Sequence, residues 1–304
     1  MAEMKTHYGI ATFIMKNTKE IKALFHLLDD PDKEIFETVS DKIVHYGKEI
    51  IPNLEHFWEE TTDNTVQERI ENIIHKVNFN DTYNDIKKWY FSPNASLMQG
   101  AMLLSKYRFP ELNEDFCRKT LKSIYQSCWL ELHNYLTPLE QIHVINSVFY
   151  SMYKFTGFDL EANKANHYYI SEVLETREGN NYSLGIIYQL LCEMLDIPVF
   201  AIQLPRQHLL AYFDNQYDFF SKDAKQVQKI QFYIDANTGT IFTQNDVDVY
   251  IKKYNFKNTE QIYLPLSNQE IVLSTIESLI MMYDELQDHE KSEELNKIVL
   301  FRGL

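Results

Sequence analysis

Apolar residues in the first half of the chain recur every three or four positions, which is the spacing of amphipathic helices. The pattern predicts helices over residues 21–28 and 35–46. A turn at Asp29-Asp30-Pro31-Asp32 joins them, with Pro31 suited to open the second helix and Gly47 to follow its end. A third apolar segment begins near Glu49 and contains an Ile-Pro-x-Leu stretch. This arrangement resembles a single HEAT-type unit near residues 17–60, and without a second copy no full solenoid is predicted.

The same helical periodicity continues to about residue 153. It predicts five more helices, over residues 66–77, 83–90, 96–107, 114–135 and 138–153. The last of these opens with Thr137-Pro138-Leu139-Glu140. Thr137 is suited to be the N-cap, Pro138 fits the first helical position, and Glu140 completes a capping box.

The pattern changes after residue 160, where short helices give way to strands. A helix over 170–177, closed by Gly179, and a helix over 183–195 come first. Segments rich in Val, Ile, Tyr and Phe then predict strands over 199–204, 208–213 and 231–235, followed by a turn at 237–239. No long helix separates the first two strands, so they should pair antiparallel, which gives an α+β fold.

The C-terminal segment returns to helix and completes a predicted division into three regions. Ser267-Asn268-Gln269-Glu270 is a capping box before a helix over 271–286, and a second helix covers 290–299. The pair resembles one tetratricopeptide-type unit. The predicted regions are a helical part over 1–160, an α+β core over 161–265 and a helical hairpin over 266–304.

Composition narrows the classes of partner. The net charge of −15, without a Lys/Arg cluster, argues against nucleic acid and anionic lipid as partners. Residues 1–16 lack the pattern of a signal peptide, and polar residues interrupt the longest C-terminal apolar stretch, 271–283. Cys117, Cys128 and Cys192 are too few and too widely spaced for a disulfide framework or a zinc site. We therefore expect a cytoplasmic protein without a membrane segment, a metal or another cofactor.

Three stretches of the second half resemble the transglutaminase-like superfamily, and in particular its bacterial SirB-type branch. The first is Val-Leu-Glu-Thr-Arg-Glu-Gly-Asn at 173–180, which continues into Ser-Leu-Gly-Ile-Ile-Tyr at 183–188. The second is Leu204-Pro205 followed by Leu-Leu-Ala-Tyr at 209–212. The third is Phe-Tyr-Ile-Asp at 232–235 with Gly239 after it. The likeness covers roughly the last half of the chain and implies a papain-like core.

The resemblance also implies a chemistry, and this chain lacks its central residue. Active members use a cysteine thiolate at a helix N-terminus, a histidine on the next strand and an aspartate on the following strand. Asn181 occupies the position of the cysteine. The histidine position falls on Gln207, and strand alternation places the neighbouring His208 on the opposite face of the sheet unless a bulge intervenes. Asp235 alone matches its family position.

Each of these residues also has a structural interpretation, which we favour for Ser183, His208 and the cysteines and which for Asp235 explains the residue equally well. Ser183 is an alternative nucleophile, but its position also suits helix capping. His208 can be a strand residue whose ring has a hydrogen-bond partner among its neighbours. Asp235 can form a turn with Asn237 and Gly239. The three cysteines fit buried packing.

Two functional hypotheses follow. The first is a non-catalytic transglutaminase-like protein that acts as a binding or scaffold module for a protein or peptide partner. Its degenerate cleft would be formed by Asn181, Ser183, Gln207, His208 and Asp235. The alternative is a cysteine-independent hydrolase or acyl-transfer enzyme with Ser183 or a cysteine from elsewhere as nucleophile. The missing thiolate favours the first hypothesis.

Overall fold

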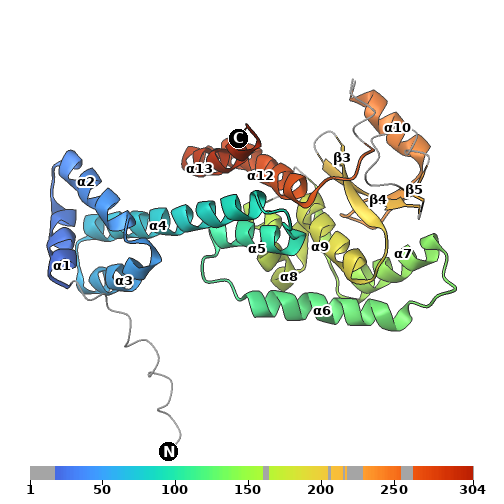
Figure 1. Cartoon of the computed structure of the whole chain (residues 1–304), viewed down its shortest axis with the longest axis horizontal. Coiled ribbons are helices and arrows are strands. Elements are labelled where there is room, and N and C mark those ends of the chain that lie inside the picture. Colours follow the sequence, from blue (N-terminus) through green and yellow to red (C-terminus); the bar gives the residue numbers. More distant parts are fainter. Residues whose placement is uncertain are drawn as a thin grey trace, which may run out of the picture. The chain divides into compact units, whose positions relative to one another are not determined.

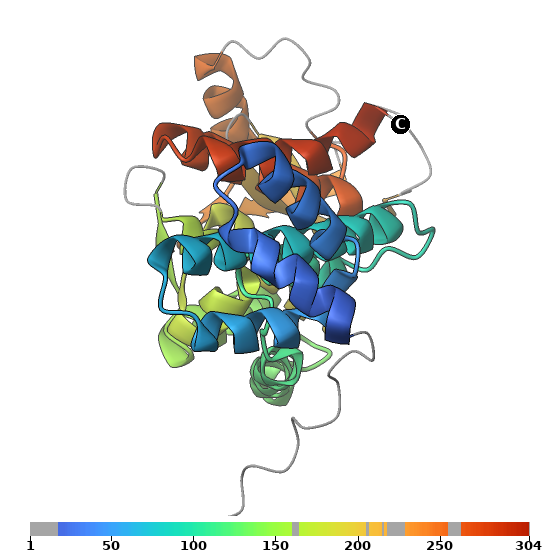
Figure 2. The same cartoon turned by 90° about the vertical axis from the view of Figure 1, so that its left-hand side faces the viewer.

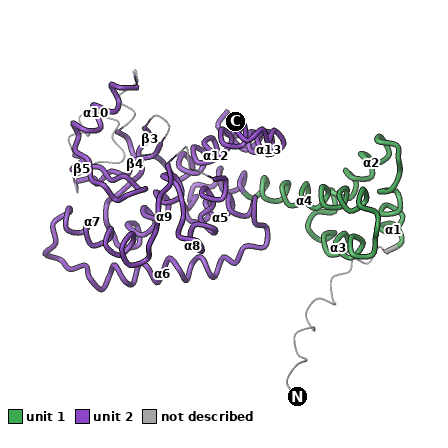
Figure 3. The backbone as a smooth tube through the Cα atoms, turned by 180° about the vertical axis from the view of Figure 1, so that it is seen from behind, with its two compact units in different colours: residues 1–85 green, residues 86–304 purple. Residues whose placement is uncertain are grey.

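The computed structural model of the chain describes residues 18–159, 164–204, 207–214, 216–217, 229–254 and 263–303. Within these ranges the fold is mostly helical, with one small parallel and one small antiparallel sheet (Figure 1). The predicted α+β class is therefore confirmed. The chain divides into two compact units, residues 1–85 and 86–304 (Figure 3). The boundary lies inside one helix, α4 (Asn64–Tyr90).

The first unit is built from α1 (Thr18–His26), α2 (Lys33–Val44), α3 (Ile51–Glu60) and most of α4. Helix α2 begins after Asp32, whose side chain accepts a hydrogen bond from Glu34 N at 2.9 Å. Pro31 therefore lies before the helix cap and not at its first position. Helix α2 ends at Val44 with His45 as its C-cap, earlier than predicted, and Gly47, two residues farther on, takes the left-handed conformation (φ 67°). The unit has an apolar core of its own, which includes Leu28, Ile43, Ile50, Leu54 and Ile70.

Helices of the second unit form its centre and two of its sides. They are α5 (Leu97–Arg108), α6 (Glu114–Glu131), α7 (Pro138–Asn146) with a π-helix (Ser147–Met152), α8 (Ile170–Thr176), α9 (Asn181–Met194), α10 (Gln244–Lys253), α12 (Asn268–Glu285) and α13 (His289–Val299). Helices α5, α8 and α9 lie between the α12–α13 hairpin and α6 (Figures 1 and 2). Helix α9 is buried along almost its whole length, so it is the central helix of this unit.

The antiparallel sheet has the strand order β3 (Val199–Leu204), β4 (Gln207–Phe213), β5 (Ile230–Ile234) and β6 (Ile241–Phe242). Strand β3 is an edge strand, and its register with β4 is unbroken from Val199–Tyr212 to Leu204–Gln207. One face of the sheet packs on α10 and the other on α9. The parallel sheet joins β1 (Thr156–Phe158) to β2 (Glu178–Asn180), directly before α9.

Most predicted elements are present, with local corrections. The segments 66–77 and 83–90 form one helix, α4, because neither Gly nor Pro interrupts the sequence between them. Helix α8 ends at Arg177, which takes the left-handed conformation (φ 69°) in place of the predicted Gly179. Gly179 instead lies in β2, where a β-carbon would come within 3.0 Å of Leu184 and Ser183 side-chain atoms. The strands β1, β2 and β6 and the helix α10 were not predicted.

Other expectations concern larger features. The second compact unit contains the helices from α5 onward together with the sheets and the hairpin, so the three-region division and the HEAT-like and tetratricopeptide-like units stay predictions. In the described part of the chain, no helix has both the length and the apolar character to cross a membrane. Within the same ranges, no three His, Cys, Asp or Glu side chains are placed to hold a metal ion. Residues 1–17 and Pro205 lie outside the described residues.

Candidate functional site at the start of helix α9

The first turn of α9 is organised by Asn180, the residue that the structure places at the N-cap. Its side-chain oxygen accepts hydrogen bonds from Tyr182 N at 3.0 Å and Ser183 N at 3.1 Å. Asn is among the preferred N-cap residues because its side chain satisfies backbone N–H groups that have no partner within the helix. The helix thus begins at Asn181, the position that the resemblance assigns to the nucleophile.

Ser183 is a structural part of this turn. Its hydroxyl accepts a hydrogen bond from Asn180 N at 3.1 Å and donates to the carbonyl of His167 at 2.5 Å. The side chain is fully buried. A serine nucleophile needs a base at its hydroxyl, and here a backbone carbonyl takes that place. The geometry is that of a capping residue.

Asn181 faces the aspartate of the family motif. Its Nδ2 donates to Asp235 Oδ1 at 3.3 Å, and the residue is only 7% exposed. An asparagine amide has no acidic proton and is a poor nucleophile at neutral pH. At the position of the missing thiol there is therefore a neutral hydrogen-bond donor that pairs with the aspartate.

Asp235 also shapes the turn that follows β5. Its carboxylate accepts hydrogen bonds from Asn237 N at 3.0 Å and from the Thr238 hydroxyl at 2.8 Å. Gly239 takes the left-handed conformation (φ 72°) that this turn requires, and a β-carbon there would meet Tyr150 at 2.6 Å. Tyr150 in turn donates to the carbonyl of Ala236 at 2.8 Å. The turn is thus fixed by neighbours on both sides.

His208 lies at the same end of α9, but its hydrogen-bond partner is in α12. Its ring packs edge-on against Tyr182, with 4.5 Å between ring centroids, and its Nε2 lies 2.6 Å from Ser274 Oγ in α12. The side chain is 2% exposed, and burial lowers its pKa to about 3. A histidine that stays neutral throughout the physiological range and is bonded to a serine is poorly suited to accept and return a proton.

The structure corrects the sequence alignment at one strand position. His208 lies on the face of the sheet that meets α9, while the neighbouring Gln207 points to the other face because side chains alternate along a strand. The register of β4 with β3 is regular here, and the pairing of β4 with β5 shifts farther along the strand, between Tyr212 and Phe213. His208 therefore reaches the helix side without a bulge at its own position.

The structure brings four of the five candidate residues to the first turn of α9, but only two of the four are hydrogen-bonded to each other, Asn181 and Asp235. His208 is hydrogen-bonded to Ser274 in α12, and Ser183 is hydrogen-bonded to Asn180 in the cap and to the carbonyl of His167. Among the described residues, no hydrogen bond joins His208 to Asp235. Sequence reasoning missed Ser274, because it lies 66 residues from His208 in a helix expected to form a separate region.

The three cysteines offer no substitute thiolate. All are free and buried. Burial raises the pKa of Cys128 to about 12 and also raises the pKa values of Cys117 and Cys192. Cys192 is the twelfth of the 14 residues of α9, far along the helix from its first turn. The prediction that the cysteines are packing residues is confirmed.

The region that contains this site matches a known protein family. The family model described as the transglutaminase-like superfamily matches residues 115–276, which is 162 of the 304 residues. The chain belongs to the transglutaminase-like superfamily. The matched region extends from α6 into α12 and includes all five candidate residues. The superfamily assignment therefore applies to the site described above.

One curated relative of this transglutaminase-like chain is UPF0162 protein BU173 from Buchnera aphidicola subsp. Acyrthosiphon pisum (strain APS). It is 23% identical over 156 residues, which is 50% of this chain and 53% of the relative. The chain thus spans about half the length of the curated relative that it matches. No solved structure matches the chain.

Proposed function

We propose that this protein is a non-catalytic member of the transglutaminase-like superfamily that acts as a binding or scaffold module for a protein or peptide. The proposal includes its place in the SirB-type branch, to which the three sequence stretches point. The observation that carries it is the hydrogen bond between Asn181 and Asp235. It puts a neutral amide where the chemistry needs a thiolate, and it engages the aspartate that would orient the histidine.

The arrangement of His208 supports the same proposal. A Cys-His-Asp site needs the histidine bonded to the aspartate on one side and free to reach the nucleophile on the other. Here the histidine Nε2 is directed to Ser274 and the ring edge to Tyr182. Ser274 and Tyr182 are both buried, so His208 contributes to packing between β4, α9 and α12.

The alternative is a cysteine-independent hydrolase or acyl-transfer enzyme that uses Ser183. Its weakness is that the Ser183 hydroxyl is already bonded to the carbonyl of His167. To act as a nucleophile it would have to break that bond and leave the buried cap. No base lies at hydrogen-bond distance from it among the described residues.

A pair of turnover assays tests the proposal. Ester hydrolysis and the incorporation of a fluorescent amine into a glutamine-containing peptide would be followed for the wild-type protein, Ser183→Ala and Asp235→Asn. The proposal predicts the same background rate for all three, with folding checked by circular dichroism. Turnover by the wild-type protein that either folded variant loses would overturn it and restore the enzyme hypothesis.

A further inference from the structure

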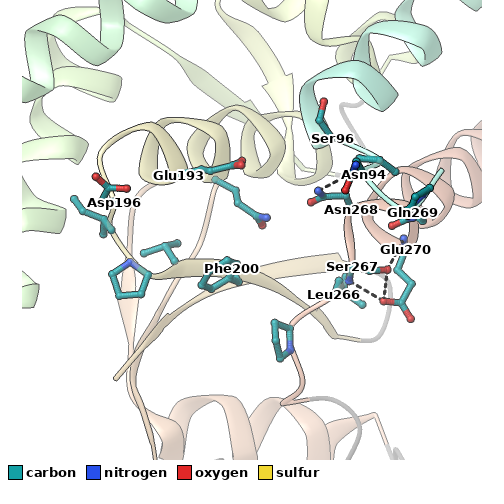
Figure 4. Close-up of a pocket in the computed structure, with 17 residues that line it drawn as sticks. Asn94, Ser96, Glu193, Asp196, Phe200, Leu266, Ser267, Asn268, Gln269 and Glu270 are labelled. Atoms are coloured by element: carbon teal, nitrogen blue, oxygen red, sulfur yellow. Dashed lines mark hydrogen bonds between the residues drawn. The ribbon is translucent and has the colours of Figure 1, made fainter. Parts of the chain in front are cut away.

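A cavity of about 880 Å³ lies in the second unit, away from the first turn of α9. The end of α9, the start of β3, the loop before α5 and the start of α12 form its walls (Figure 4). Glu193 and Asp196 lie on the α9 side, Asn268 and Gln269 lie on the α12 side, and Phe200 lies between them. Its volume is within the range of ordinary ligand sites, about 300–1,000 Å³.

All charged side chains that line the cavity are acidic. Glu193, Asp196 and Glu270 line it, and none of the described lining residues is Lys, Arg or His. Glu270 Oε2 accepts hydrogen bonds from the backbone N–H and the hydroxyl of Ser267, both at 2.7 Å. Glu193 and Asp196 are exposed. A wall of carboxylates without a cation favours a positively charged ligand group.

A buried amide supplies the second requirement on the ligand. Gln189 is only 5% exposed and lines the cavity. Its Oε1 accepts a hydrogen bond from Ala201 N at 2.8 Å, which fixes the orientation of the amide because a backbone N–H needs an acceptor. Its Nε2 therefore stays available, and it donates to none of the described residues. A ligand that fills the cavity should present a hydrogen-bond acceptor to this nitrogen, since a buried donor without a partner costs about 1–3 kcal/mol.

The cavity also follows a sheet edge. Strand β3 is an edge strand, and the backbone groups of Ala201 point outward from it. The segment before α12 already pairs there, with Leu266 N donating to Ala201 O at 2.8 Å. Both outward backbone groups of Ala201 are therefore engaged, so the donor that remains for a ligand at this edge is Gln189 Nε2. A peptide offers a backbone carbonyl for that donor together with a charged side chain.

We propose that this cavity binds a lysine or arginine residue of an extended peptide. The cationic side chain lies between Glu193 and Asp196, and a neighbouring peptide carbonyl accepts a hydrogen bond from Gln189 Nε2. The inference rests on the proposed binding role of the protein and names the class of its partner. It assigns binding to a cavity distinct from the degenerate cleft, so substitutions in the cleft should leave peptide binding unchanged.

Calorimetric titration and amide NMR with short capped peptides test the proposal. The probes are acetyl-Ala-Lys-Ala-amide, the same peptide with norleucine for lysine, and n-butylamine, which has the single ammonium group of the lysine side chain but no carbonyl. The lysine peptide should bind and shift the side-chain amide signal of Gln189. The norleucine peptide should bind at least about tenfold more weakly, as expected from the loss of about 1.4 kcal/mol or more of ion pairing. The butylamine cation should bind at least about fivefold more weakly than the lysine peptide.

Matched variants locate the site. Glu193→Gln with Asp196→Asn removes two charges from exposed positions, and Asp196 has a φ of 55°, which asparagine also tolerates. This double variant should bind the lysine peptide at least about fivefold more weakly than the wild-type protein. Asp284→Asn with Glu285→Gln removes two exposed charges from the far end of α12 and should not change binding.

Three results would overturn the proposal. The first is no binding of the lysine peptide to the folded wild-type protein at millimolar concentration. The second is unchanged binding by the Glu193/Asp196 variant, and the third is binding of butylamine as tight as that of the lysine peptide. None of them would change the turnover assays, so a failure here is distinct from a failure of the non-catalytic assignment.

Discussion

Asn181 Nδ2 donates a hydrogen bond to Asp235 Oδ1 at 3.3 Å, across 54 residues of sequence. The contact joins the first residue of α9 to the turn after β5. In a working Cys-His-Asp site these two positions would hold a nucleophile and a residue that acts through the histidine. Here the two side chains are hydrogen-bonded directly to each other, and the histidine is hydrogen-bonded to Ser274 in α12.

Replacement of Asn181 with aspartate tests how closely the two side chains face each other. Asn181→Asp keeps the size of the side chain but puts a second carboxylate beside Asp235. Like charges at this distance should lower the free energy of unfolding by about 1–3 kcal/mol at pH 7, which exceeds the gain of about 0.3–1 kcal/mol from a carboxylate at a helix start.

The pH dependence of the Asn181→Asp variant tests whether charge repulsion causes the loss of stability. One of the two carboxyls has a raised pKa in the folded state, so the destabilisation is present near pH 7 and decreases as the pH falls through that value. Urea unfolding at pH 7 and pH 4 measures it. Asn113→Asp, at the exposed cap of α6, is the control and should be nearly neutral. Equal stability of Asn181→Asp and the wild-type protein at pH 7 would show that the contact is loose.

Removal of the Ser183 hydroxyl should cost stability rather than activity. Ser183→Ala loses the hydrogen bond to His167 O and the one from Asn180 N, both buried. We expect a loss of about 1–3 kcal/mol in the free energy of unfolding. Ser123→Ala removes an exposed hydroxyl that bonds to Lys119 O in α6, and it should change stability by less than about 0.5 kcal/mol. A Ser183→Ala variant as stable as Ser123→Ala would contradict the capping role.

His208 makes stability depend on pH. Burial lowers its pKa to about 3 in the folded protein, whereas an unfolded histidine titrates near 6.5. Between these values the unfolded state binds more protons, so this contribution to stability is complete above about pH 6.5 and is lost as the pH falls toward 3. The slope for one group is at most about 1.4 kcal/mol per pH unit.

His208→Gln isolates that contribution, because glutamine can still bond to Ser274 but does not titrate. Urea unfolding between pH 7 and pH 5 should show a shallower loss of stability in the variant than in the wild-type protein. Parallel slopes for the two proteins would mean that His208 is accessible to protons in the folded state.

The cysteines should be protected until the protein unfolds. Cys117, Cys128 and Cys192 are buried, and the raised pKa values leave little thiolate at pH 7. Mass spectrometry after brief iodoacetamide treatment should find all three thiols unmodified in native protein and modified in urea. Rapid alkylation of one of them in native protein would identify a thiol open to solvent and restore it as a possible nucleophile.

The sequence predicted the order of the elements around the site because their signals are local. The capping box at Thr137, the turn at Gly239 and the apolar strand at 199–204 depend on residues close together in sequence. The position of Asn181 at a helix start followed from the same local pattern. The partners of the site residues could not be predicted in this way, because tertiary packing determines them. Ser274 reaches His208 only because α12 packs beside α9 and β4.

The alignment of the histidine shows a related limit. A one-residue difference in alignment reverses the face of a strand, and the sequence alone does not decide between Gln207 and His208. The cavity beside Gln189 had no sequence signal either. Its walls come from four segments between residues 93 and 270 that contain no shared motif.

The most direct measurement of the central claim is turnover by Asn181→Cys, which supplies the thiol that the superfamily uses. The variant would be assayed for ester hydrolysis and amine incorporation from pH 6 to pH 9, beside the wild-type protein and Asn181→Cys with His208→Gln. We expect no turnover above the wild-type background, because His208 is neutral and hydrogen-bonded to Ser274 and because the Asp235 carboxylate disfavours a thiolate beside it. Turnover by Asn181→Cys that the additional His208→Gln substitution abolishes would contradict it, since the histidine would then still be placed for catalysis.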